Sequence, residues 1–119
     1  MNQNRRKSAL GGLLLAWLAA ASIGMAAADL SAVNVFPNPA RAYIGQTQVT
    51  FANLTEQVQV KIFNAAGGLV REASLGASGG QFLWLLDNNS GDPVASGIYV
   101  YLITNDSGEE LRGKVAVIR

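Results

Sequence analysis

The acidic loop at residues 87–92 is the segment whose residue types best fit a chemical site. Its order, Asp-Asn-Asn-Ser-Gly-Asp, resembles the start of a calcium-binding loop, in which acids and amides alternate as oxygen ligands. Asp87 and Asn89 fit the first and third ligand positions. Gly91 stands at the fifth position, however, and Ile98 stands at the twelfth, where a bidentate glutamate is needed. We therefore expect an asparagine-rich turn and no metal ligands.

The composition excludes most catalytic mechanisms. The chain has no histidine and no cysteine, so serine–histidine and cysteine–histidine constellations, ordinary zinc sites and disulfide bonds are impossible. Catalysis by carboxylates alone needs two acids held close together, whereas the acidic residues here fall at turns and at outward strand positions. We expect no catalytic residue, no cofactor and no small-molecule substrate, so the protein is predicted not to be an enzyme.

The first 28 residues have the layout of a secretory signal peptide. A positive segment at residues 5–7 precedes an apolar run at residues 9–21, and three alanines at residues 26–28 fit a cleavage site before Asp29. The apolar run is too short to span a membrane on its own. We predict export through the inner membrane, no membrane insertion after cleavage, and a mature domain at residues 29–119 that is periplasmic, cell-surface or extracellular.

The expected mature domain has no charge pattern for nucleic acid or anionic membranes. It carries six basic and eight acidic side chains, a net charge of −2, and no basic patch. We therefore expect protein partners. A domain of about 90 residues without disulfides must be stabilised by packing and by hydrogen bonds within its sheets.

Seven short segments with strand-like patterns predict an all-β, Ig-like antiparallel β-sandwich. Glycine, proline and asparagine mark turns between them, and no segment of the mature region has the period of a helix. The predicted strands are residues 33–36, 48–54, 58–64, 69–75, 81–86, 98–105 and 111–119.

Three details of this prediction concern the second half of the chain. The apolar run at residues 81–86 favours a strand that is buried on both faces. The strand at residues 98–105 is predicted to be central, with Tyr99 and Tyr101 in packing roles rather than on a recognition surface. The loop between Gly91 and Gly97, followed by this alternating strand, predicts a β-hairpin.

Several motifs lie in order along residues 33–119. Besides the terminal strand at 114–119, they consist of Pro37, Asn38, Pro39, Gly68 (or Gly67), Trp84, Asn88, Gly91, Pro93, Ser96, Gly97, Tyr99 and Tyr101. In this order they resemble two related families: the type A C-terminal sorting domains of type IX secretion, and the Ig-like domain of flagellar hook-capping proteins. The resemblance covers nearly all of residues 33–119, although Leu85 stands where the family usually has aspartate.

The resemblance implies a secretion module that an outer-membrane translocon recognises. In that interpretation the terminal strand is the docking strand, formed by Lys114, Val115, Ala116, Val117, Ile118 and Arg119. A sorting domain normally follows a large passenger, whereas only residues 29–32 separate the expected signal peptide from the domain. The alternative is a stand-alone structural or interaction domain of a periplasmic or cell-surface assembly, which pairs with itself or with other proteins through its sheet edges.

Overall fold

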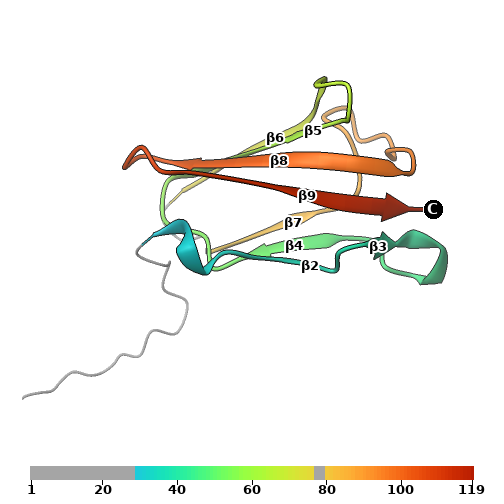
Figure 1. Ribbon diagram of the computed structural model, residues 1–119, viewed down its shortest axis with the longest axis horizontal. Helices are drawn as coiled ribbons and strands as arrows, with labels where there is room; N and C mark the ends of the chain where they lie inside the picture. Colours follow the sequence, from blue (N-terminus) through green and yellow to red (C-terminus); the bar gives the residue numbers. More distant parts are fainter. Residues whose placement is uncertain (1–28, 77–79) are drawn as a thin grey trace, which may run out of the picture.

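The computed structural model describes residues 29–76 and 80–119, and the predicted signal peptide lies outside this part of the chain. The described residues form two β-sheets packed face to face (Figure 1), which confirms the predicted Ig-like β-sandwich. The smaller sheet has the strand order β2-β4-β7, and the larger has the order β3-β9-β8-β5-β6. All neighbours are antiparallel except β3 and β9, which are parallel.

The eight strands of the described residues follow the predicted segments closely, with one addition. The two-residue β3 was not predicted, because two residues carry no periodicity. Two short 3-10 turns, η1 (Leu30–Ala32) and η2 (Ala42–Ile44), complete the fold, and no described helix is long and apolar enough to span a membrane. The strands are β2 (Asn34–Phe36), β3 (Ala40–Arg41), β4 (Val49–Ala52), β5 (Val58–Phe63), β6 (Leu69–Leu75), β7 (Gln81–Trp84), β8 (Gly97–Asn105) and β9 (Glu110–Ile118).

The core lies between the two sheets and is built around aromatic contacts. Trp84 of the small sheet is fully buried and meets Tyr99 of the large sheet edge to face, with ring centroids 5.6 Å apart. Phe51 meets Tyr101 in the same way at 5.3 Å. Such pairs contribute about 0.5–1.5 kcal/mol each beyond the area they bury. They hold together two sheets that no disulfide connects.

The Pro37-Asn38-Pro39 segment carries the chain from one sheet to the other. The strand before it, β2, pairs with β4 in the small sheet, and the strand after it, β3, pairs with β9 in the large sheet. The Asn38 side chain donates to the carbonyl oxygen of Lys114 at 2.9 Å and accepts from the amide of Ala116 at 3.1 Å. This single amide therefore serves one donor and one acceptor of the β9 backbone, as a paired strand would.

A second asparagine covers the opposite edge of the large sheet. The backbone amide of Asn89 donates to the carbonyl oxygen of Val70, and its side-chain oxygen accepts from the amide of Glu72, both at 2.9 Å. Since Val70 and Glu72 lie on β6, the loop at residues 87–92 covers this edge strand. Both edges of the large sheet are thus partly occupied by residues of the chain itself.

The predicted hairpin between residues 81–86 and residues 98–105 was wrong. The strands β7 and β8 do not form a hairpin, because β7 pairs with β4 while β8 lies between β5 and β9. The loop between them crosses from one sheet to the other, and an isolated bridge joins Asp87 to Pro93 within it. The hydrophobic alternation identified the strands correctly, but their partners depend on contacts that are distant in the sequence.

The predicted burial of residues 81–86 on both faces was also wrong, because this segment is buried on one face only. Phe82, Trp84 and Leu86 are buried, whereas Leu83 and Leu85 are 40% and 59% exposed. The strand also ends at Trp84, because Leu86 has a φ of 57°, a left-handed conformation that cannot continue a strand. This conformation costs about 1–2 kcal/mol, which burial of the Leu86 side chain offsets.

We predict that Asn38→Ala lowers the free energy of unfolding by about 1–2 kcal/mol, because one donor and one acceptor of β9 lose their partner. Asn34→Ala is the matched control, since Asn34 is exposed on β2 and its side chain has no hydrogen bond among the described residues. Urea unfolding followed by circular dichroism measures both variants. Equal effects of the two substitutions would contradict the role assigned to Asn38.

Candidate functional site

Three turns of the chain are built in the same way from the pattern Asn-x-x-Gly. The first residues are Asn64, Asn88 and Asn105, and each side-chain oxygen accepts from the backbone amides two and four residues later. The glycine of each turn has a φ of 86–91° and donates to the carbonyl oxygen of the asparagine. Glycine adopts this left-handed conformation without the cost that a side chain imposes.

These turns give structural roles to several motif residues. Asn88 and Gly91 form one turn, and in the turn after β5 the left-handed glycine is Gly67, while Gly68 closes the turn through its amide and carbonyl. The repeated pattern was visible in the sequence, but our sequence analysis did not use it. Its signal is the spacing of asparagine and glycine, three residues apart, between predicted strands.

The acidic loop has few groups free to bind a cation. The side-chain oxygens of Asn88 and Asn89 already accept backbone amides. Asp87 faces Arg71, with 3.7 Å between the carboxylate oxygen and the guanidinium nitrogen. Within residues 29–76 and 80–119, no three acidic side chains are grouped as metal ligands. The arrangement supports a structural loop.

We predict that EDTA leaves the melting temperature unchanged, because the side-chain oxygens of Asn88 and Asn89 are engaged within the chain and no three described acidic side chains are grouped as ligands. Thermal unfolding with and without EDTA, followed by addition of calcium, measures this. A shift of several degrees in either experiment would show that residues 87–92 bind a cation.

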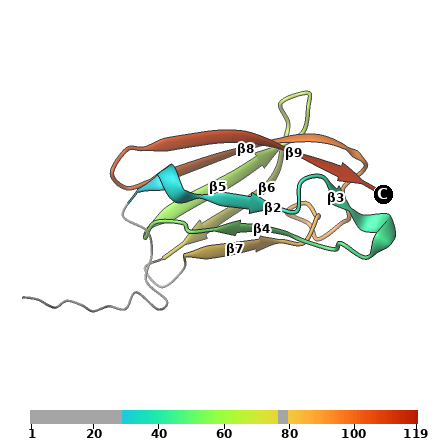
Figure 2. The ribbon, with the colours of Figure 1, turned by 60° about the horizontal axis from the view of Figure 1, so that its bottom comes forward.

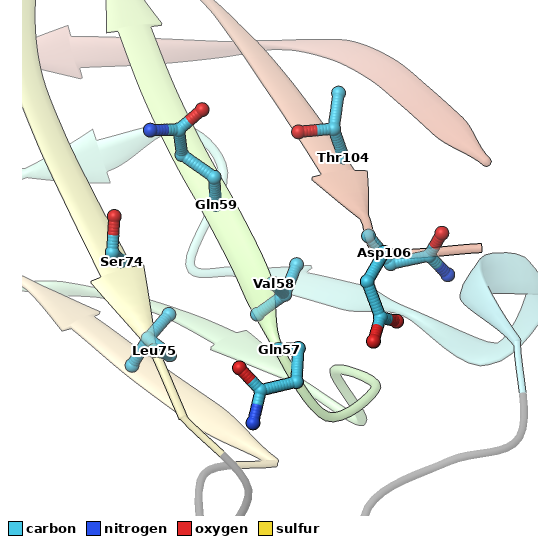
Figure 3. Close-up of a pocket in the computed structure, with 8 residues that line it drawn as sticks. Gln57, Val58, Gln59, Ser74, Leu75, Thr104 and Asp106 are labelled. Atoms are coloured by element: carbon cyan, nitrogen blue, oxygen red, sulfur yellow. The ribbon is translucent and has the colours of Figure 1, made fainter. Parts of the chain in front are cut away.

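A shallow depression of about 250 Å³ lies on the outer face of the large sheet, where β5 begins and where β6 and β8 end (Figure 3). Gln59 lies between Ser74 and Thr104 in the strand register, and Gln57 and Asp106 complete the rim. Its polar groups are amides, hydroxyls and one carboxylate. Because Asp106 is the only acid that lines it, the depression has no pair of carboxylates for general acid–base catalysis.

The two tyrosines of β8 are packing residues. The Tyr99 hydroxyl donates to the carbonyl oxygen of Ala95 at 2.6 Å, and its ring lies against Trp84. The Tyr101 ring lies across Gly113 on the neighbouring strand, where a side chain on residue 113 would overlap it. Burial raises the pKa of both phenols above the ordinary value of 10.0, and the positive charge of Arg119 partly offsets this for Tyr99.

These pKa shifts predict a loss of stability in alkaline solution. The tyrosines of the unfolded chain lose their protons at a lower pH than those of the folded chain. Their contribution to stability is therefore fully present below about pH 10 and declines above it. We expect the free energy of unfolding to fall less steeply above pH 10 in the Tyr99→Phe/Tyr101→Phe variant than in the wild type. Identical slopes in urea titrations across this range would contradict the prediction.

The predicted docking strand at residues 114–119 is only partly available to a partner. Val115 and Val117 are buried in the core. The backbone amide of Arg119 donates to the Ser96 hydroxyl at 2.9 Å, and its guanidinium group donates to the carbonyl oxygens of Leu86, at 3.0 Å, and of Val94. Arg119 thereby ties the end of β9 to the loop between the sheets.

The residues of this strand that face outward belong to a larger surface, which we call the β8 outer face. Ile98, Val100 and Leu102 alternate with the inward-facing tyrosines, so they lie on the outside of the sandwich, and Ile98 is 49% exposed. In the strand register, Lys114 lies beside Val100, and Lys61 lies beside Leu102 from the other side. Neither lysine forms an ion pair within the described part of the chain. An apolar row flanked by cations suits a protein surface that carries carboxylates at its rim.

Comparison with known proteins gives a family and two related structures. Residues 41–111 match the sequence profile of the FlgD Ig-like domain. PorZ, an essential bacterial surface component of the type IX secretion system of Porphyromonas gingivalis, is 30% identical over 79% of this chain, with a TM-score of 0.65. Latent dimeric PorU from the same organism is 25% identical over 72% of this chain, with a TM-score of 0.53. The matched regions span only 12% of PorZ and 9% of PorU, and no curated protein sequence matches the chain.

Proposed function

This chain belongs to the FlgD Ig-like domain family, and on that basis we propose that it is an exported, non-catalytic module that binds proteins of an outer-membrane secretion machinery. The observation that carries the proposal is the 30% identity to PorZ, a surface component of the type IX system. The absence of histidine and cysteine and the engaged groups of the acidic loop support a binding role rather than catalysis.

We place the partner site on the β8 outer face. The buried valines and the anchored Arg119 leave the outward side chains of β9 as the accessible part of the predicted docking strand. Lys114 is one of these, and it adjoins Val100 on β8. Burial of the apolar row would supply most of the affinity, while the flanking lysines would select a partner with acidic residues at the rim.

Cell fractionation with and without the type IX machinery tests this function. We expect the mature protein outside the cell or on its surface only when the machinery is present, and retention in the periplasm without it. Periplasmic retention in both strains would overturn the secretion role and favour the alternative, a stand-alone module of a periplasmic assembly.

The site is tested by Ile98→Lys, which places a charge in the apolar row. We expect about a tenfold loss of surface or secreted protein, because a charge at the centre of an interface loses its hydration. Ile44→Lys is the matched control, since Ile44 is also an exposed isoleucine, at 61%, but lies in η2 and outside both sheets. Equal export of both variants at wild-type levels would show that the partner binds elsewhere.

A further inference from the structure

The two sheets of this domain differ sharply in charge. The strands of the small sheet, β2, β4 and β7, contain no charged residue. Every charged residue found in a described strand belongs to the large sheet. They are Arg41, Lys61, Arg71, Glu72, Glu110, Arg112 and Lys114.

The two sheets also differ in how far their edges are covered by other residues of the chain. In the large sheet, Asn38 and β3 cover part of β9, and Asn89 covers part of β6. In the small sheet, β7 pairs only with β4 among the described strands, and Figure 2 shows it at the rim of that sheet. Natural proteins protect edge strands with charges, prolines or covering segments, because an unpaired backbone attracts another strand. Residues 81–84 of β7 include no charge and no proline, and the nearest charge given for the strand is Arg71 of β6, whose guanidinium carbon lies 5.9 Å from the centroid of the Phe82 ring.

The side chains of β7 also favour association. Leu83 in β7 and Leu85, which directly follows the strand, are 40% and 59% exposed. In the strand register, Leu83 shares a row with Thr50 and with Phe36, which is 45% exposed. The centre of a protein interface is depleted in charged residues, and this uncharged row resembles it in that respect.

We propose that β7 pairs antiparallel with β7 of a second copy of this chain, which joins two small sheets into one continuous sheet. A suitable occupant must be extended, uncharged and apolar at alternate positions, and β7 itself meets these requirements. A two-fold pairing centred on Leu83 brings the two Leu83 side chains together on the outer face, and no like charges meet across it. The edge of β6, in contrast, carries Arg71 and Glu72 and is covered by Asn89.

This inference goes beyond the proposed secretion role and concerns the opposite sheet. The paired strands are short, so the dimer is expected to be weak and to form with rising concentration. Sedimentation equilibrium of the purified protein, at loading concentrations up to about 1 mM, measures it. We expect the average mass to rise from that of a monomer toward that of a dimer.

Substitutions distinguish association through the β7 edge from association through other exposed leucines. Leu83→Lys places two lysines next to each other across the axis, so we expect a dissociation constant raised roughly tenfold or more. Leu85→Lys, at a more exposed position beside the same edge, is expected to act in the same direction. Leu69→Lys is the matched control, because Leu69 is 48% exposed on the edge strand β6 of the other sheet, and it should leave the constant unchanged. Circular dichroism confirms that each variant is folded.

Two results would overturn the proposal. One is a wild-type protein that stays monomeric over the whole concentration range, even if Leu83→Lys impairs export, because the edge would then serve a different protein. The other is a dimer that Leu69→Lys weakens as much as Leu83→Lys and Leu85→Lys do. The secretion role is judged separately, since it depends on Ile98→Lys and on export rather than on mass.

Discussion

The fold depends on asparagine side chains that hydrogen-bond to the backbone where the sheets cannot. A small domain without disulfides has many strand ends and edges for its size, and each leaves donors and acceptors unpaired. Asn64, Asn88 and Asn105 satisfy these groups at turns, and Asn38 and Asn89 satisfy them at sheet edges. An amide can do so because it offers a donor and an acceptor in the geometry of a peptide group.

Strand positions were predictable because the alternation of apolar and polar residues is a local property of the sequence. The position of β5 and the central place of β8 follow directly from the sequence pattern. Which sheet each strand joins was not predictable in the same way. The separation of β7 from β8 depends on the left-handed turn at Leu86 and on the burial of that side chain, which are set by packing between residues far apart in the sequence.

The motif residues that identify the family explain the fold rather than the partner. Asn38 joins the two sheets, Asn88 forms a turn, and Trp84 and Tyr99 meet in the core. The Ser96 hydroxyl accepts from the amide of Arg119 and holds the end of β9. A resemblance carried by such residues establishes the architecture, whereas the choice of partner depends mainly on outward side chains such as Ile98 and Lys61, which are not among these structural motif residues.

The two outer surfaces of the sandwich therefore suit different kinds of partner. On the large sheet, Lys61 and Lys114 flank an apolar row, so its affinity for a partner should depend on the partner's charge and on salt. On the small sheet, the row from Phe36 to Leu83 is uncharged and ends at an open edge, so backbone pairing and apolar contact dominate. Since the surfaces lie on opposite sheets, occupation of one leaves the other accessible. We therefore expect that a single small domain can bind a secretion component and a second copy of itself at the same time.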